Sequence, residues 1–225
     1  MNAAAEFRAV SKVYGRFAAL RNVSVTFTAG SCSVILGSNG AGKSTLLRLA
    51  AGLTGPTRGQ VTVFETEPQQ QLGRLAYMSH ASMLYDEFSA MENLRYFAAL
   101  AKDRGCDCAG SPEMALRAVG LDPALKRPVG EYSQGMRQRT SFARVLQSDP
   151  ELLLLDEPFS NMDAASVRQM VELLADFRTW PVAGGGSRTI LLTTHQAQLA
   201  MPLADQVVTL ENGEVALAEL AGAAS

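Results

Sequence analysis

The sequence predicts an α/β fold in which a parallel sheet carries an N-terminal antiparallel β segment and an inserted helical segment. Short apolar runs without polar alternation, such as residues 152–155, are typical of strands that are buried on both faces. Residues 7–28 instead alternate apolar and polar side chains, which favours an antiparallel hairpin or meander. From about residue 90 to 148 the pattern is helical. Strands separated by helices imply a parallel sheet that is covered on both faces.

The first half of the chain is expected to contain further short strands and one helix. A strand at 33–36 ends in a glycine-rich turn, and a helix at 44–51 follows it. Two further short strands are expected at 60–64 and 75–78. Glycine and proline then break the helical stretch at residues 105–112, 120–123 and 128–130.

The second half is expected to complete the sheet. The remaining strands and helices are predicted, in chain order, at residues 152–155, 164–178, 189–193 and near 196–203. A glycine-rich stretch at 184–187 reads as a flexible connection. A closing hairpin of residues 207–210 and 214–217 is expected around Asn212-Gly213, because this dipeptide favours a tight turn.

We therefore expect one domain over residues 1–225, made of two lobes. Residues 1–80 and 149–225 are predicted to form the sheet core with its antiparallel segment. Residues 81–148 are predicted to form the helical lobe. No internal repeat is visible in the sequence.

Composition narrows the possible partners. Apolar residues make up 47% of the 225 and charged residues 19%, which is ordinary for a globular protein. The formal net charge is -2 and the pI about 5.8. This balance speaks against a protein that binds nucleic acid through a broad basic face, so no nucleic-acid partner is expected.

Cysteine usage and hydropathy indicate the cellular setting. Cys32, Cys106 and Cys108 are too few, and odd in number, for a disulfide framework. Because no second Cys or His pair lies near Cys106 and Cys108, a solvent-facing loop is favoured there over a metal site. A reducing cytoplasmic setting fits best. No secretory signal and no apolar run of the roughly 18 residues that span a bilayer are present, so a membrane role is expected to come through a partner chain.

The strongest chemical signal follows the strand at 33–36. It is the run Gly37-Ser38-Asn39-Gly40-Ala41-Gly42-Lys43-Ser44-Thr45, which fits the phosphate-binding P-loop pattern G-x-x-x-x-G-K-[ST]. Glycines let backbone N–H groups converge on phosphate oxygens, and the next helix directs its positive end at the same anion. Lys43 would reach the β- and γ-phosphates of a nucleotide, and Ser44 would offer its hydroxyl to Mg²⁺. The flanking strand and helix favour this interpretation over a turn without a ligand.

The second signal is a buried strand that ends in two carboxylates. Residues 152–155 are all leucine, and Asp156 and Glu157 follow them. Parallel sheets present their ligands at the carboxyl edge, so both acids are expected beside the glycine-rich turn. Asp156 would hold Mg²⁺ and Glu157 would act as general base on an attacking water. A strand end with solvated acids is the simpler alternative, and the upstream P-loop makes it less favoured.

A third run separates families of nucleotide-binding proteins. Residues 132–136 read Tyr-Ser-Gln-Gly-Met and resemble the LSGGQ signature of ABC transporter ATP-binding subunits, followed by an RQR and later AR run at 137–139 and 143–144. Ser133 and Gly135 match the pattern, whereas Tyr132, Gln134 and Met136 depart from it. A serine hydroxyl and glycine N–H at a helix start form a second anion cradle, although the run alone also fits an ordinary helix N-cap. The resemblance covers residues 7 to about 215 and implies the ABC ATPase version of the P-loop NTPase fold.

Other positions then follow the order of that family. Tyr14 resembles the aromatic residue that stacks on adenine, with a half-buried strand tyrosine as the alternative. Asp163 resembles the D-loop aspartate, which helps to join two subunits. His195, which follows a predicted buried strand, resembles the histidine that contacts the γ-phosphate. An imidazole suits that task because it can hydrogen-bond to both phosphate and water.

His80 is a departure from the family pattern. Most members carry a glutamine at the end of the strand that precedes the helical lobe, and His80 stands in its place. Neutral histidine has one donor and one acceptor, so it can partly replace the glutamine as a ligand of Mg²⁺ and water. We therefore expect His80→Gln to keep ATPase activity, and activity to change between about pH 5 and 8.

The same region suggests a subfamily. His80 and the run LYDEFSAMENLRYF at 84–97 resemble the ATP-binding subunits of cytochrome c maturation haem exporters, which carry a similar continuation. Drug-exporter subunits share parts of this pattern and remain an alternative. Aromatic residues at 83–88 and 94–97 are interpreted either as a groove for a helix of the membrane subunit or as packing inside the helical lobe.

The resemblance implies how the chain works. Two copies, or this chain and a paralogous ABC subunit, would enclose ATP and Mg²⁺ between the P-loop of one and Ser133–Gly135 of the other. An integral membrane subunit would hold the pair at the cytoplasmic face of the membrane. A non-transport ABC ATPase and a P-loop kinase are the other function classes. The first usually carries long insertions or a second ATPase domain, and the second would not need the signature.

Overall fold

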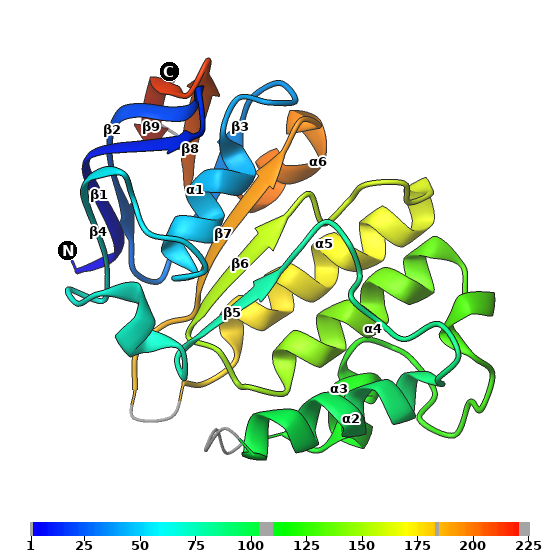
Figure 1. The fold of residues 1–225 in the computed structure, drawn as a ribbon. Helices are drawn as coiled ribbons and strands as arrows, with labels where there is room; N and C mark the ends of the chain where they lie inside the picture. Colours follow the sequence, from blue (N-terminus) through cyan, green and yellow to red (C-terminus); the bar gives the residue numbers. More distant parts are fainter. Residues whose placement is uncertain (1, 104–109, 183–184, 221–225) are drawn as a thin grey trace.

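The computed structural model describes residues 2–103, 110–182 and 185–220. Its N-terminal part is a three-stranded antiparallel sheet in the order β2-β1-β4 (Figure 1). The strands are β1 (Ala3–Tyr14), β2 (Phe17–Thr28) and β4 (Arg58–Val63). The antiparallel segment expected for residues 7–28 is therefore confirmed, and its first strand begins earlier, at Ala3.

The second sheet has six strands in the order β5-β6-β7-β3-β8-β9. Neighbours from β5 to β8 run parallel, and only β9 is antiparallel to the strand beside it. The strands are β3 (Cys32–Leu36), β5 (Leu75–Met78), β6 (Leu152–Asp156), β7 (Thr189–Thr194), β8 (Gln206–Glu211) and β9 (Glu214–Leu220). Asn212 and Gly213 join β8 to β9 with φ values of +50° and +82°, as the predicted tight turn requires.

Helices cover the six-stranded sheet. They are α1 (Lys43–Ala50), α2 (Ala90–Asp103), α3 (Pro112–Ala118), α4 (Gln134–Leu146), α5 (Ala164–Thr179) and α6 (Ala197–Ala200). Three short 3₁₀ turns, Pro68–Gln71, Val129–Glu131 and Met201–Leu203, complete the helical elements. Figure 1 shows α2, α3 and α4 together on the far side of α5 from the antiparallel sheet. The helical segment between β5 and β6 thus stands beside the sheet as an insertion.

The expected strand at 60–64 does not join the parallel sheet. It forms β4, which pairs antiparallel with β1 through partners such as Phe7 and Val61. Val61 and Val63 are buried while their neighbours are less so, which is the alternation of a strand covered on one face. Gly59 permits the close approach, because a Cβ there would lie 2.3 Å from the carbonyl oxygen of Ala9.

The central strand β6 is buried on both faces, as its apolar run predicts. Leu153 and Leu155 pack into the core formed with α4 and α5, whereas Leu152 and Leu154 pack into the core formed with α1 and the antiparallel sheet. A strand in this position has no face left for polar groups. Its polar residues, Asp156 and the following Glu157, therefore come only where the strand leaves the sheet.

Some expectations fall on residues without described positions. Cys106 and Cys108 lie outside the described residues, as does the first glycine of the connection at 184–187. Cys32 is buried, and burial raises the pKa of its thiol to about 12. Among residues 2–103, 110–182 and 185–220, no helix is both long and apolar enough to cross a bilayer.

Candidate active site

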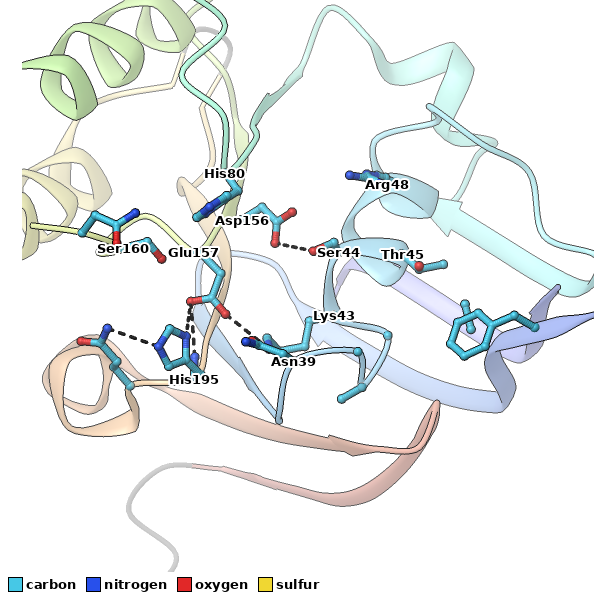
Figure 2. Close-up of a pocket in the computed structure, with 17 residues that line it drawn as sticks. Asn39, Lys43, Ser44, Thr45, Arg48, His80, Asp156, Glu157, Ser160 and His195 are labelled. Carbon is cyan, nitrogen blue, oxygen red and sulfur yellow. Dashed lines mark hydrogen bonds and ion pairs between the residues drawn. The ribbon is translucent and has the colours of Figure 1, made fainter. Parts of the chain in front are cut away.

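A cavity of about 630 Å³ opens where the parallel strands end. The glycine-rich turn and the first turn of α1 form one wall, and residues after β5, β6 and β7 form the other. Figure 2 shows Lys43 and Ser44 on one side and Asp156, Glu157, His80 and His195 on the other. Residues far apart in the sequence are thus brought together at the carboxyl edge of the sheet, as expected for a parallel sheet.

The glycine-rich turn adopts a backbone that side chains would prevent at two places. Gly37 has φ +154°, and a Cβ there would lie 2.5 Å from the carbonyl oxygen of Leu210. Gly42 has φ +105° as N-cap of α1, and a Cβ there would lie 2.6 Å from the carbonyl oxygen of Ala19. The turn therefore packs against β2 and β8 and leads directly into α1, whose first residues line the cavity. Such a helix start favours anions.

Lys43 is folded across this turn. Its side chain is 6% exposed, and Nζ donates hydrogen bonds to the carbonyl oxygens of Gly37 at 2.7 Å and Ser38 at 3.2 Å. The same Nζ lies 3.3 Å from Oε1 of Glu157. A buried ammonium with these acceptors supplies one fixed positive charge to the cavity.

Asp156 accepts hydrogen bonds from three hydroxyl groups. Ser44 Oγ donates to Oδ1 at 2.9 Å, and Thr193 Oγ1 donates to the same oxygen at 2.8 Å. Tyr77 OH donates to Oδ2 at 3.1 Å. The hydroxyl of Ser44 and the carboxylate of Asp156 are hard oxygen donors in contact with each other, which is the ligand type that Mg²⁺ prefers. The residues present therefore fit Mg²⁺.

Glu157 lies between a cation and an imidazole. Its Oε2 is 3.0 Å from Nδ1 of His195, while Oε1 faces Lys43. The backbone of Glu157 has φ +52°, a region that non-glycine residues rarely adopt. Its N–H donates to both the carbonyl oxygen and Oγ1 of Thr193, at 3.1 and 3.2 Å, which holds it in that conformation. The side chain is 14% exposed, so it reaches the cavity without being freely solvated.

Tyr77 and Arg48 extend the polar network behind Asp156. Burial, and then the negative charge of Asp156, raise the pKa of Tyr77 to about 12. A hydrogen bond to Tyr77 raises the pKa of Arg48, which lines the cavity from α1. The Tyr77 phenol is therefore protonated at neutral pH and acts as a donor. Tyr77, Arg48 and Thr193 were not predicted from the sequence. For Tyr77 and Thr193 the available signal was a polar group near the end of a strand that is largely apolar, whereas Arg48 lies on α1.

Some of the predicted P-loop residues line the cavity, and others lie behind them and contact Lys43. Seven of them, Asn39, Gly40, Ala41, Gly42, Lys43, Ser44 and Thr45, line the cavity. Gly37 and Ser38 lie behind them and contribute their carbonyl oxygens to Lys43. His80 lines the cavity from the end of β5 and is exposed. Ser160 and Asn161, which belong to the run that resembles the D-loop, also line it, as does Gln196, which was not predicted as a site residue.

The predicted adenine-stacking residue is not in the cavity wall. Tyr14 is 45% exposed, and Nζ of Lys12 lies 4.9 Å from its ring centroid. Its partner across the β1–β2 turn, Phe17, is 60% exposed and does line the cavity. The exposed aromatic ring beside the P-loop in this conformation is therefore Phe17.

The predicted signature residues also lie apart from the cavity of their own chain. Ser133 is the N-cap of α4, and its Oγ accepts a hydrogen bond from the N–H of Met136 at 3.2 Å. Ser133 and Gln134 are exposed. Gly135 is buried against α5, where a Cβ would lie 2.2 Å from Oγ of Ser166. None of these residues is among those that line the cavity.

Asp163 begins the helix that Gly135 touches. It is the N-cap of α5, and its Oδ1 accepts hydrogen bonds from the N–H groups of Ala165 and Ser166, both at 2.9 Å. Its Oδ2 accepts a hydrogen bond from Oγ of Ser166. The backbone N–H of Ser166, followed by its hydroxyl, holds the pKa of Asp163 below its ordinary value of 3.8. The carboxylate is therefore ionised at neutral pH and available on the surface.

Comparisons with known proteins agree with this geometry. A family model described as "ABC transporter" matches residues 20–160. The fluoroquinolones export ATP-binding protein of Mycobacterium tuberculosis is 36% identical over 201 residues, which cover 88% of this chain and 64% of that protein. The phosphonates import ATP-binding protein of Frankia casuarinae is 34% identical over 236 residues, which cover 97% of this chain and 91% of that protein. The chain thus spans just under two thirds of the first relative.

A solved structure shows the same fold. It is described as a dimeric ATP-binding cassette in a post-hydrolysis state bound to ADP and Pi. It superimposes with a TM-score of 0.79 and 22% identity, covering 96% of this chain and 98% of that one. The predicted α/β fold, with its antiparallel segment and helical insertion, is confirmed by this likeness.

Proposed function

This chain belongs to the ABC transporter family of ATP-binding domains, and we propose that it hydrolyses ATP as one half of a dimer that drives a separate membrane subunit. The observation that carries the proposal is the cavity in which Lys43, Asp156, Glu157 and His195 meet while Ser133 lies elsewhere. A phosphate cradle, a carboxylate pair and a poised imidazole suit phosphoryl transfer to water. The signature residues lie outside the cavity of their own chain, as expected for a site that a second subunit completes.

The residues of the cavity divide the work of nucleotide binding. The turn at 37–42 and the first turn of α1 would receive the phosphates, and Lys43 would exchange its contact with Glu157 for phosphate oxygens. Ser44 and Asp156 would hold Mg²⁺, which neutralises phosphate charge when it is bound. Phe17, which lines the cavity from the β1–β2 turn, would meet the base in place of the predicted Tyr14.

Hydrolysis needs a base beside the γ-phosphate. Glu157, once released from Lys43, would accept a proton from the attacking water. His195 already lies 3.0 Å from Glu157 and would orient this carboxylate and contact the phosphate. Glu157 has a positive φ where the chain leaves β6, and its side chain lines the cavity.

A direct assay separates this function from a P-loop kinase. We expect the purified protein to release inorganic phosphate from ATP when Mg²⁺ is present, and to lose that activity when EDTA is added. The activity should rise more than linearly with protein concentration, because two chains form each site. Transfer of phosphate to a small acceptor in place of water, or activity strictly linear with concentration, would contradict the proposal.

His80 is expected to act as a replaceable polar contact. It lies in the cavity wall at the end of β5, next to Asp156 in Figure 2. We predict that His80→Gln retains ATP hydrolysis within about threefold of wild type, because glutamine also offers one acceptor and donors at that place. His80→Ala should lose about tenfold or more through the lost contact. Equal activities of the alanine and glutamine variants, measured by phosphate release, would argue against any role for His80.

An aromatic patch marks a surface for the membrane subunit. Tyr85, Phe88 and Tyr96 are exposed. Their ring centroids lie 5.0 to 6.3 Å apart, in tilted or edge-to-face arrangements. Leu94 is fully buried and Phe97 lies under the guanidinium of Arg144, so these two follow the packing alternative. A loop from His80 leads to the patch, which links it to the cavity. Exposed aromatic residues of this kind are enriched in protein interfaces.

Substitution of the patch tests this interface. Tyr85→Ala and Tyr96→Ala are predicted to reduce sedimentation of the chain with membranes of its own host by about tenfold, because anchoring aromatic residues contribute about 1.5 kcal/mol or more. ATP hydrolysis by the free chain should be unchanged. Met114→Ala, at an exposed apolar position on α3, is the matched control. Full membrane association of both tyrosine variants would remove the patch from the interface.

Two kinds of transported substrate are considered for the complete transporter, namely haem and a drug. Haem export rests on the resemblance of residues 79–97, whereas the name of the fluoroquinolone relative favours a drug exporter. Loss of the gene in its own host distinguishes them. Haem export predicts loss of c-type cytochromes, and drug export predicts increased sensitivity to the exported compound with cytochromes intact.

A further inference from the structure

The Asp156 carboxylate is held from the strands on both sides of it. β6 lies between β5 and β7, and Asp156 stands in register with Thr193 of β7. Thr193 donates to Oδ1 at 2.8 Å and Tyr77 of β5 donates to Oδ2 at 3.1 Å. Neither residue is among those that line the cavity, and Thr193 is fully buried. Both hydroxyls therefore contact the carboxylate from positions outside the cavity wall.

We propose that Thr193 and Tyr77 are positioning residues that fix the two oxygens of Asp156 for the cation that accompanies the nucleotide. This inference rests on the proposed function of the cavity. Ser44 also donates to Oδ1, but it is the hydroxyl that would turn toward the cation. The hydrogen bonds from Thr193 and Tyr77 would then remain as the only ones described here that hold Asp156. Groups that orient a metal ligand in this way tune the affinity for the metal.

Thr193 has a second contact that Tyr77 lacks. Its Oγ1 accepts the N–H of Glu157 at 3.2 Å while it donates to Asp156. One hydroxyl thus joins the two acids and helps to hold the left-handed backbone of Glu157. Removing it should disturb the base as well as the cation ligand. Of the two acids, Tyr77 hydrogen-bonds only to Asp156, so its removal should spare the base.

Tyr77 can act only as a donor to Asp156. Its hydroxyl oxygen lies 3.1 Å from Oδ2, and an ionised carboxylate has no proton to donate in return. The proton of the phenol is therefore directed at Asp156.

The test uses Mn²⁺, a spin-active substitute for Mg²⁺, with ADP and the full chain. Electron paramagnetic resonance of free Mn²⁺ measures how tightly the protein–ADP complex holds the ion. Tyr77→Phe and Thr193→Val are each expected to weaken Mn²⁺ binding about tenfold, in the range seen when outer partners of metal ligands are removed. Affinity for ADP without metal should stay within about twofold of wild type. Thr193→Ser, which keeps the hydroxyl, should restore most of the Mn²⁺ affinity.

Thr189→Val is the matched control for folding. Thr189 is a fully buried threonine at the other end of β7, and its Oγ1 accepts the N–H of Gly30. The Thr189→Val variant should have its melting temperature lowered about as much as Thr193→Val, and its Mn²⁺ affinity should be unchanged. Wild-type Mn²⁺ affinity in both Tyr77→Phe and Thr193→Val, or an equal loss in Thr189→Val, would overturn the positioning role alone. A wild-type protein that holds no Mn²⁺ with ADP would overturn the proposed function as well.

Discussion

Glu157→Gln is expected to reduce ATP hydrolysis by about 100- to 10,000-fold while nucleotide binding persists. The substitution keeps the size of the side chain but removes the only carboxylate among the described residues that lies between Lys43 and His195. A glutamine amide cannot accept a proton from water at neutral pH. Because Lys43 then loses a competing anion, affinity for ATP should be equal to or higher than that of wild type.

The same variant should accumulate as a dimer when Mg-ATP is present. ATP bound between the P-loop of one chain and the Ser133 turn of another would hold the pair together, and slow hydrolysis would prolong its life. Light scattering behind gel filtration measures the mass. Glu151→Gln, just before the opposite end of β6 and paired with Arg74, is the control and should hydrolyse ATP normally. A monomeric Glu157→Gln protein, alone and with its membrane partner, would refute the shared site.

Lys43→Ala is expected to weaken binding of ATP by about 100-fold or more. Hydrogen bonds to charged groups contribute about 1.5 to 3 kcal/mol each, and Lys43 would make more than one to the phosphates. Its loss also releases the carbonyl oxygens of Gly37 and Ser38, which it now ties together. The cradle should therefore become less ordered before the nucleotide arrives.

Titration with a fluorescent ATP analogue measures this effect. Lys102→Ala, at an exposed lysine near the end of α2, is the control and should bind like wild type. Circular dichroism and melting temperature show whether Lys43→Ala is folded. Binding within about threefold of wild type by a folded Lys43→Ala protein would mean that the phosphates lie elsewhere.

Local patterns predicted much of the fold. The four leucines at 152–155 required a strand buried on both faces, and β6 is such a strand. Asn212-Gly213 required a tight turn, and β8 and β9 meet there. By contrast, no pattern within residues 60–64 states which sheet they join. That choice depends on the fit of Val61 and Val63 against β1, which is a property of the assembled core.

Only the site residues that belong to a recognisable sequence motif could be predicted. The residues of the P-loop and the acids after β6 lie together because their spacing specifies a turn and a strand end. Thr193 and Tyr77 reach Asp156 because of the register of β5, β6 and β7. The sequence of a single strand does not determine that register. In the same way, the β1–β2 turn decides that Phe17 and not Tyr14 lines the cavity.

Gly135 and Ser166 bring the starts of two helices into close contact. A Cβ at position 135 would lie 2.2 Å from Oγ of Ser166, so the start of α4 packs directly on the start of α5. Ser166 is bonded in turn to Asp163, three residues after Ser160 in the cavity wall. A rotation of the helical insertion would therefore displace that wall directly. Any residue larger than glycine at 135 would wedge this joint open within its own chain, so its effect could not be assigned to a neighbouring subunit.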